Sequence, residues 1–501
     1  MLTALTSTTA HAHPYINPDD RLLRADLQYL VDSGVAEVPL TTWPLPREQL
    51  RPLVEADVSD QPAAVQAAHN RVVSRITQPS RAELTARVAS DPDPRTYFSD
   101  VPIHEQELEA AVNLGSSSER WGGRIQANAH RHDRDDASTK TETYLDGSYA
   151  AVRLGNWLVH GGAQDRWWGP GSEGSLILTD NARPVPSVGF DRVAAEPFDL
   201  PVLRWLGPWN LTTFLGELDG DRKDAPYAKL FGMRVAFRPY SGLEIGLSRT
   251  AQWGGEGRPE DLNSFWRMFT GQSNIGDDPD NEPEGGHANQ FAGWDLRWAS
   301  PLGTAPYAIY MQLIGIDEAG NYLSWPYQNM GLAGIETWWA GAGGNRYRWH
   351  FEAADTATNF WREEGPSSDR SARNYNNAYT HSFYEDGYRY HDRVQGHSMD
   401  SGGQMFSTGL QLVEPKGYYW ELLVRYTQQN RGGRDDTDRD VKRRAPAVME
   451  QADFLVIDIT RGLHYGPLTI ELNLGAEQKA PAEGERELEM RGWTRVSWDL
   501  F

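Results

Sequence analysis

The residues best suited to chemistry lie in one block, residues 165–192, which reads DRWWGPGSEGSLILTDNARPVPSVGFDR. Trp167 and Trp168 stand beside a turn-forming Gly-Pro-Gly sequence at 169–171. Indole rings have broad apolar faces, so such a pair can stack on the apolar faces of sugar rings. The same pair can also pack in the interior. The block therefore predicts either a carbohydrate contact or a buried aromatic cluster.

Charged and amide side chains surround these indoles. Guanidinium groups pair bidentately with carboxylates, so this set can bind an acidic glycan or form a buried internal network. Pro184 and Pro186 fix φ and lack an N–H, which favours an ordered loop folded into the interior over a fully paired strand. We expect the following residues to shape the block: Asp165, Arg166, Gly169, Pro170, Gly171, Asn181, Pro184, Pro186, Asp191 and Arg192.

A second aromatic and polar cluster lies at residues 380–403, THSFYEDGYRYHDRVQGHSMDSGG. His381, His391 and His397 lie there, but no pair of them has the i, i+4 spacing of a helical metal motif. Three interpretations stay open: a glycan contact, a plain solvated loop or a metal site. The carbohydrate hypothesis places sugar contacts at Trp167, Trp168, Arg183, Tyr384, Tyr388, Arg389 and Tyr390.

Catalysis has little support in the sequence. Carboxylate pairs such as Glu173 with Asp180, or Asp191 with Glu196, could imitate a glycosidase pair, but acidic residues number 70 of 501, so such pairs arise by chance. No G-x-S-x-G, H-E-x-x-H or P-loop motif occurs, and there is no cysteine. We therefore expect no catalytic residue, no metal and no cofactor.

The composition narrows the classes of partner. The net charge of −22 argues against binding the phosphate backbone of nucleic acids, which requires a basic face. Aromatic residues make up 11%, too many for a disordered chain. The acidic loop at residues 276–286, GDDPDNEPEGG, is expected to be a solvated outer loop, with weak divalent-cation binding as the alternative, because its spacing breaks the EF-hand pattern.

The first 90 residues differ from the rest of the chain. Residues 1–12 end in Ala-His-Ala and resemble the end of a secretory signal, although an ordinary polar N-terminus fits as well. Residues 13–90 show helical spacing, with Asn17 as the expected N-cap of a first helix and another helix near 61–77. We expect a small helical domain over 13–90.

From about residue 107 the hydrophobic period changes to two. Phe231, Met233 and Val235 point one way, whereas Arg234 lies on the opposite face and should share it with Glu244 of the next strand. Charged residues on the second face fit either the solvated side of a soluble sheet or the wet lumen of a barrel. The same alternation recurs at residues 292–298, 307–313, 347–352, 418–426, 468–474 and 494–500.

The lengths of the connections favour the barrel. No run approaches 18 consecutive apolar residues. Short turns at residues 155–156, 238–242 and 414–417 alternate with long polar connections such as 254–288 and 363–402, as in barrels with short periplasmic turns and long outer loops. We predict that residues 91–501 form an all-β transmembrane barrel of antiparallel strands.

The block at residues 165–192 closely resembles the signature region of the Wzi family of capsule-assembly proteins, and the helical start LRADLQYLVDSGVAEVPLTTWPLP is similar to that of the same family. The resemblance implies a Gram-negative outer-membrane β-barrel of about 18 antiparallel strands with its helical segment on the periplasmic side. It further implies a lectin-like, non-enzymatic protein that helps attach exported capsular or extracellular polysaccharide to the cell surface. Implied partners are this polysaccharide, outer-membrane lipid and other capsule-export components.

Two other functions stay open at the level of the sequence. A porin-like channel for small solutes shares the barrel but needs an open lumen. A secreted polysaccharide-degrading enzyme of all-β fold would bury its apolar face inside a water-soluble sheet. The orientation of the apolar side chains therefore decides whether the membrane assignment stands.

Overall fold

The computed structural model describes residues 14–77, 82–90, 108–118, 120–133, 139–222, 225–271, 288–300, 306–316, 328–365, 372–375, 377–381, 383–433 and 451–500. The expected signal remnant at 1–12 and the acidic loop at 276–286 lie outside these residues.

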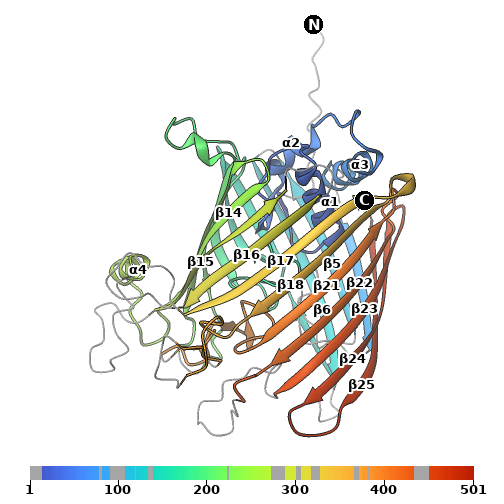
Figure 1. Cartoon of the computed structure of the whole chain (residues 1–501). Helices are drawn as coiled ribbons and strands as arrows, with labels where there is room; N and C mark the ends of the chain where they lie inside the picture. Colours follow the sequence, from blue (N-terminus) through green and yellow to red (C-terminus); the bar gives the residue numbers. More distant parts are fainter. Residues whose placement is uncertain are drawn as a thin grey trace.

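A closed antiparallel β-barrel of strongly tilted strands forms the body of the protein (Figure 1). Strand β25 pairs with β4 and closes it, with Trp498 opposite Leu84. β6 pairs with β7 through one part of its length and with β8 through another, so β7 and β8 form one interrupted strand. The described residues thus give eighteen strands, which confirms the predicted fold. The barrel strands are β4 (Ala82–Ser90), β5 (Leu108–Ser117), β6 (Trp121–Asp133), β7 (Thr139–Tyr144), β8 (Tyr149–Leu154), β9 (Trp157–Ala163), β11 (Pro186–Arg192), β12 (Trp209–Glu217), β13 (Lys229–Tyr240), β14 (Leu243–Trp253), β15 (Asn289–Ala299), β16 (Tyr307–Ile316), β17 (Asn329–Ala340), β18 (Arg346–Asp355), β21 (Gln404–Val413), β22 (Tyr419–Gln429), β23 (Ala452–Tyr465), β24 (Leu468–Pro481) and β25 (Glu487–Asp499).

Helices occupy most of the N-terminal segment. The expected helix near 61–77 is present as α3, but the N-cap of α1 is Asp20 rather than Asn17, because the Asp20 side chain accepts a hydrogen bond from the Leu23 N–H at 2.8 Å. The helices are α1 (Arg21–Asp32), α2 (Arg51–Val54), α3 (Ala63–Thr77) and α4 (Leu262–Phe269), and the 3-10 turns are η1 (Arg47–Leu50), η2 (Arg204–Leu206) and η3 (Ala342–Gly344). The described residues also form three two-stranded sheets: β1 (Tyr15–Ile16) with β3 (Leu45–Pro46), β2 (Thr42–Trp43) with β10 (Trp167–Trp168), and β19 (Arg389–Tyr390) with β20 (Arg393–Val394).

The barrel begins earlier than the sequence indicated. The expected boundary at residue 90 assigned 82–90 to the helical domain, whereas these residues form β4 between β25 and β5. Leu84 and Val88 are exposed on the outer face and Arg87 is buried. This short stretch therefore already follows the period of two of the barrel wall.

The wall has its apolar side chains outside and its charged side chains inside. On the hairpin of β13 and β14, Arg234 is fully buried and Glu244 is buried, whereas Leu247 is 51% exposed. This is the reverse of a water-soluble protein and is the pattern of a barrel in lipid. Other outward apolar residues are Val188, Leu215, Ile309, Met311, Ile335, Phe351, Phe406, Leu410, Leu422, Ile457, Leu472 and Leu474; other buried charged residues of the wall are Asp295, Arg297, Glu336, Glu352, Arg425 and Asp458.

In the described parts of the chain, no helix is both long enough and apolar enough to cross a membrane.

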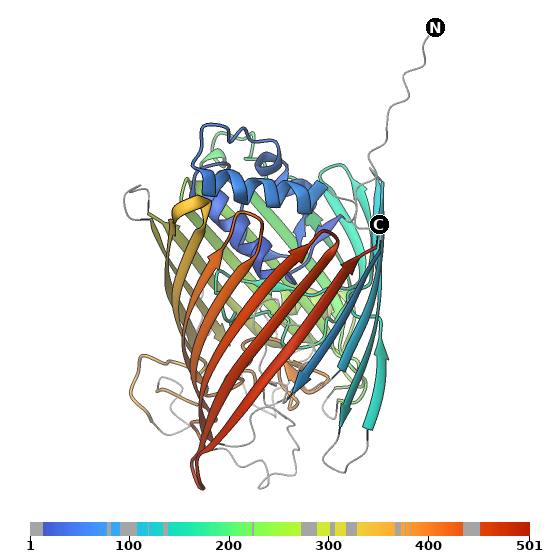
Figure 2. The same ribbon diagram turned by 90° about the vertical axis from the view of Figure 1, so that its right-hand side faces the viewer.

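The two ends of the barrel differ. Figure 2 shows the N-terminal helices set into one mouth, the end with short turns. Arg71 of α3 donates to the carbonyl oxygens of Glu414 and Pro415, in the short turn between β21 and β22. The connections that hold α4 and β19–β20 lie at the opposite end, whereas one longer connection, residues 193–208 with η2, lies at the helical end (Figure 1).

Candidate functional site in the barrel lumen

The connection between β9 and β11, residues 164–185, runs into the lumen and meets the N-terminal segment there. Trp167 and Trp168 form β10, which pairs with Thr42 and Trp43 of β2. Both indoles of β10 are completely buried. In this structure they pack inside the protein, as the packing interpretation of the block expects, and sugar contact by either ring stays a prediction.

The turn after the two indoles is fixed by the wall. Gly169 has a φ of 142°, and a Cβ there would lie 2.6 Å from Nε2 of Gln312 on β16. The Gln312 amide donates to the Trp168 carbonyl at 2.8 Å and accepts from the Leu176 N–H at 2.7 Å. The close approach of backbone to wall explains why this turn is built with glycine.

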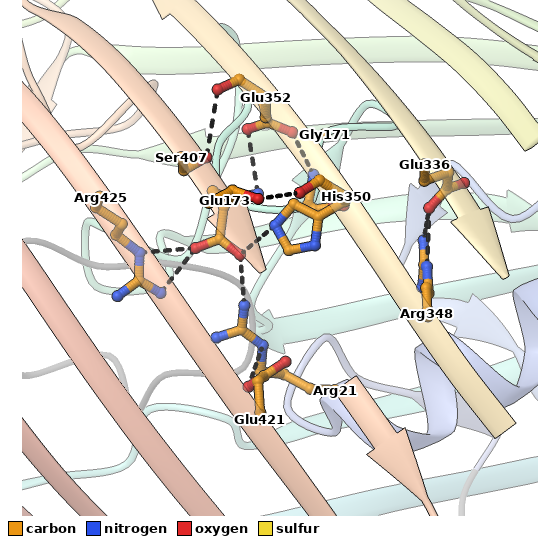
Figure 3. A network of polar contacts seen from close by, with 12 residues as sticks. Arg21, Gly171, Glu173, Glu336, Arg348, His350, Glu352, Ser407, Glu421 and Arg425 are labelled. Atoms are coloured by element: carbon orange, nitrogen blue, oxygen red, sulfur yellow. Dashed lines mark hydrogen bonds and ion pairs between the residues drawn. The ribbon is translucent and has the colours of Figure 1, made fainter. Parts of the chain in front are cut away.

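Glu173 is the centre of a buried ionic network (Figure 3). Its Oε1 lies 2.7 Å from Nη2 of Arg21 on α1 and 3.3 Å from Nε2 of His350 on β18. Its Oε2 lies 2.7 Å from Nη2 of Arg425 on β22. Burial alone would raise the pKa of Glu173, but Arg425 and Arg21 outweigh it and hold this pKa well below its usual range.

A second wall carboxylate holds the backbone of the same turn. Glu352 on β18 accepts hydrogen bonds from the N–H groups of Ser172 at 2.6 Å and Glu173 at 3.2 Å, and from the Tyr310 hydroxyl at 2.8 Å. Arg24 of α1 donates to the Gly171 carbonyl at 2.6 Å. The turn is therefore fastened to α1 and to three strands of the wall.

The other half of the segment is joined to the long connection between β18 and β21. Thr179 N–H donates to the Gln395 carbonyl at 2.8 Å, and the Asn181 side chain donates to the Val394 carbonyl at 2.8 Å. The Tyr379 hydroxyl donates to the Leu176 carbonyl at 2.8 Å. Segment 164–185 thus bridges the N-terminal helices and the outer connections.

The described part of the 380–403 cluster is packed, which corrects its interpretation as a plain solvated loop. Tyr384 and Tyr388 are fully buried, and the Tyr388 ring lies 4.4 Å from the Phe291 ring. Arg389 forms a buried pair with Asp400, Nη2 to Oδ1 at 2.6 Å. The aromatic side chains are held inside because they contact the lumen segment and the wall. Their role in sugar contact stays a prediction.

The histidines of this cluster show no sign of a metal site. His397 is fully buried and burial lowers its pKa to about 3, so the ring is neutral at physiological pH. Among the described residues, no three His, Cys, Asp or Glu side chains converge in a way that could hold a metal ion.

Arg183 and Tyr390 come together at the partly exposed outer side of the lumen segment. The Arg183 guanidinium pairs with Asp146, Nε to Oδ2 at 2.7 Å, and lies 3.6 Å above the Tyr144 ring. Burial raises the pKa of Tyr390 to about 12, and the nearby Arg183 acts in the opposite direction. The Tyr390 ring also lies 4.3 Å from the exposed His391. We name Arg183, Asp146, Tyr144, Tyr390 and His391 the outer cluster.

The remaining residues expected to shape the block form the internal network that the sequence left as one alternative. Arg166 donates to Ser187 Oγ at 2.8 Å and lies 4.0 Å over the Phe214 ring. Asp191 accepts from Tyr15 and Thr212, and Arg192 lies 3.9 Å over Trp209. Both Asp191 and Glu173 are thus engaged in structural contacts.

The two prolines behave differently from each other. Pro184 is buried in the lumen segment, as expected. Pro186 is exposed and begins strand β11, where it pairs with Ala163. The expectation of a loop through both prolines is therefore wrong for Pro186, because the first residue of a strand tolerates the missing N–H.

A cavity of about 590 Å³ remains between the helices and the wall. It is lined by α1, α3 and strands β4 to β6, β24 and β25, and Asp165 reaches it from the lumen segment. Asp165 Oδ1 has no hydrogen-bond partner among the described residues, and burial raises the pKa of this carboxyl to about 7.

Sequence reasoning missed the partners that fix the segment. Arg21 was not singled out, whereas the alternation placed His350, Glu352 and Arg425 on the polar faces of their strands without linking them to Glu173. The available signal was charge at inward positions of predicted strands. That signal marks many residues, and it does not tell which of them meet Glu173.

Taken together, a closed, tilted barrel with an apolar outside, helices in one mouth and a folded segment in the lumen defines a β-barrel of the outer-membrane type whose interior is occupied by its own chain. The chain belongs to the Wzi family of capsule assembly proteins, whose model matches residues 80–478.

Two relatives illustrate this membership. A protein in the cps region of Klebsiella pneumoniae, itself uncharacterised, is 36% identical over 367 residues, which cover 72% of this chain and 68% of the relative. The solved structure of Wzi of Escherichia coli, an outer-membrane protein involved in group 1 capsule assembly and a carbohydrate-binding β-barrel, is 27% identical. It aligns with a TM-score of 0.79 over 97% of this chain and 99% of that one. The present protein is thus an outer-membrane β-barrel.

Proposed function

We propose that this protein binds exported capsular or related extracellular polysaccharide and helps attach and organise it at the cell surface, as a lectin-like barrel without catalytic activity. The observation that carries the proposal is the similarity over nearly the whole chain to a carbohydrate-binding barrel of capsule assembly. The occupied lumen supports a binding role over an open pore, because the lumen segment is fastened to the wall at both ends.

The proposed orientation places the helices on the periplasmic side and the long connections outside the cell. Barrels of the outer membrane have short periplasmic turns and long outer loops, and the helices lie at the end with short turns. Other capsule-export components would then meet the helical end, and polysaccharide would meet the opposite end.

The outer cluster is the proposed place of sugar contact. Of the seven residues named from the sequence, Arg183 and Tyr390 lie there, whereas Trp167, Trp168, Tyr384, Tyr388 and Arg389 hold the surrounding structure. The Arg183 side chain is 20% exposed and its partner Asp146 is 13% exposed. A carboxylate of an acidic glycan can therefore replace Asp146 as the partner of Arg183 without opening the core.

Deletion of the gene tests the cellular role. We expect the amount of cell-attached polysaccharide to fall and the amount of shed polysaccharide to rise, with total synthesis unchanged. Unchanged attachment would refute the anchoring role even with the barrel intact. Purified protein incubated with the polysaccharide should release no reducing sugar ends.

Binding by the purified protein tests the site. Arg183→Gln should weaken binding of the polysaccharide about tenfold, because a charge-assisted hydrogen bond is lost. Arg192→Gln is the matched control, since Arg192 belongs to the same block but lies at the end of β11 that leads to η2. Equal binding by both variants would remove Arg183 from the contact surface.

A further inference from the structure

Helix α4 lies on the outside of the barrel wall. Arg234 points into the lumen, so Phe231, three residues earlier on β13, points outward. The rings of Phe265 and Phe269 of α4 each lie 5.8 Å from the Phe231 ring. The Phe265 ring also lies 5.3 Å from Trp253 at the end of β14. Figure 1 shows α4 beside the barrel and outside its outline.

Specific contacts hold α4 in place on this wall. Its N-cap Asp261 accepts from the Ser264 N–H at 2.7 Å. At the other end, the guanidinium of Arg249 on β14 donates to the carbonyl oxygens of Phe269 at 2.6 Å and Met268 at 2.7 Å. The helix is therefore capped at both ends and docked on the wall.

The face of α4 that points away from the wall is apolar. Leu262 is 87% exposed and Trp266 is 60% exposed. The two residues are four positions apart, so their side chains lie on one face of the helix, one turn from each other. Nothing in the described parts of the chain covers them.

The position of α4 along the wall coincides with the edge of the lipid-facing belt. On β14, outward Leu247 is exposed and apolar, and the next outward residue is the polar Arg249. The Arg249 guanidinium also donates to the side-chain oxygen of Gln290 on β15, another polar residue. The apolar belt thus ends where α4 begins, and Trp is the residue that typically occupies the boundary between hydrocarbon and headgroups.

We propose that α4 is an interfacial helix whose Leu262 and Trp266 insert into the bilayer at the rim of the barrel. The occupant of this face is lipid because α4 lies at the edge of the outward apolar belt of β13 and β14. An amphipathic helix lying in the interface, with Leu and Trp on its buried side, has this geometry. With the orientation proposed above, the leaflet that α4 contacts is the outer one, so this part of the inference rests on the proposed function. The contact with lipid itself does not depend on that orientation.

The absence of native cysteine allows a direct test, because a single introduced cysteine carries a single label. Leu262→Cys and Trp266→Cys are labelled with an environment-sensitive fluorophore. The proteins are then placed in phosphatidylethanolamine–phosphatidylglycerol vesicles with and without lipopolysaccharide. Quenching is measured with nitroxide-bearing acyl chains and with aqueous iodide. Leu247→Cys is the lipid-facing control, and Asp392→Cys, on the exposed turn between β19 and β20, is the aqueous control.

We expect labels at 262 and 266 to resemble the label at 247, with severalfold stronger quenching by acyl-chain nitroxide than at 392 and weak quenching by iodide. Iodide quenching equal to that at 392 overturns the proposal. A response that appears only when polysaccharide is added assigns this face to sugar instead. A response that depends on protein density assigns it to a second copy. Polysaccharide binding measured on the same vesicles separates failure of this inference from failure of the proposed function.

Discussion

The two halves of the lumen segment meet the rest of the protein in different ways. Toward α1, Glu173 is fully buried and has Arg21, His350 and Arg425 within ion-pair distance. Toward the outer connections, the Arg183 side chain is 20% exposed to solvent and pairs with Asp146. One half is a closed ionic network, and the other is a pair at the edge of solvent.

This difference separates contacts that fix the position of the lumen segment from contacts that can bind a solute. A fully buried charge is costly unless its partners remain in place, so the Glu173 network defines one position of the segment. A partly exposed pair is worth little to stability, and its members can exchange partners with solutes. We therefore expect substitutions near Glu173 to change folding and substitutions near Arg183 to change binding.

The largest effect should come from Glu173→Gln. The variant removes the buried negative charge that Arg21 and Arg425 share, although Arg21 keeps Glu421 and Arg425 keeps Asp458 as neighbours. Loss of this central carboxylate should lower the free energy of unfolding by about 3–5 kcal/mol. Urea unfolding of the protein in lipid vesicles measures this loss. The control is Glu414→Gln, whose ion pair with Arg461 is more exposed and is worth less than about 1 kcal/mol. Equal losses in both variants would contradict the distinction between the two halves.

Asp165 should make stability fall as the pH rises. Burial raises the pKa of its carboxyl in the folded protein to about 7, so between about pH 4 and 7 the folded state binds a proton that the unfolded chain has released. The resulting loss between pH 5 and 8 is on the order of 2–4 kcal/mol. Asp165→Asn should remove this loss, which unfolding curves at the two pH values will test. An unchanged pH profile in the variant would show that Asp165 titrates normally.

The Glu173 half should also be sensitive to added volume. A Cβ on Gly174 would lie 2.1 Å from Nε2 of the buried His397, so Gly174→Ala forces the two segments apart. We expect a loss of about 1–3 kcal/mol in the free energy of unfolding. Gly161→Ala is the control, since its Cβ would have no neighbour closer than 3.7 Å. A neutral Gly174→Ala would mean that the contact with His397 is loose.

The smallest effect on stability should come from Arg183→Gln. Because the pair with Asp146 is partly exposed, we expect a loss of about 1 kcal/mol or less in urea unfolding. The same variant should show the strongest decrease in polysaccharide binding. A large loss of stability with unchanged binding would reverse the roles assigned to the two halves.

Much of the fold follows from short-range pattern. The period of two places Arg234 and Glu244 on one face, and the structure confirms that both are buried in the lumen. The boundary at residue 90 was wrong because β4 is short and directly follows the helices. A nine-residue strand gives only four or five alternations, too few to stand out beside α3.

The candidate site was only half predictable. Its block was recognised from its residue types and its family resemblance, but the partners of Glu173 are 152 residues away at Arg21 and 252 away at Arg425, and only barrel closure brings them together. The burial of Tyr384 and Tyr388 was not predictable, because alternating aromatic and charged residues have the same composition in a packed loop as on an exposed binding surface.

The link between α3 and β4 has a consequence for biogenesis. α3 ends at Thr77, β4 begins at Ala82, and β4 makes the seam with β25 near the C-terminus. The helices that fill the mouth are thus joined by four residues to the strand that closes the barrel with β25, so closure at this seam positions the helices. We expect a chain cleaved between residues 77 and 82 before assembly to close its barrel without the helices held in the mouth.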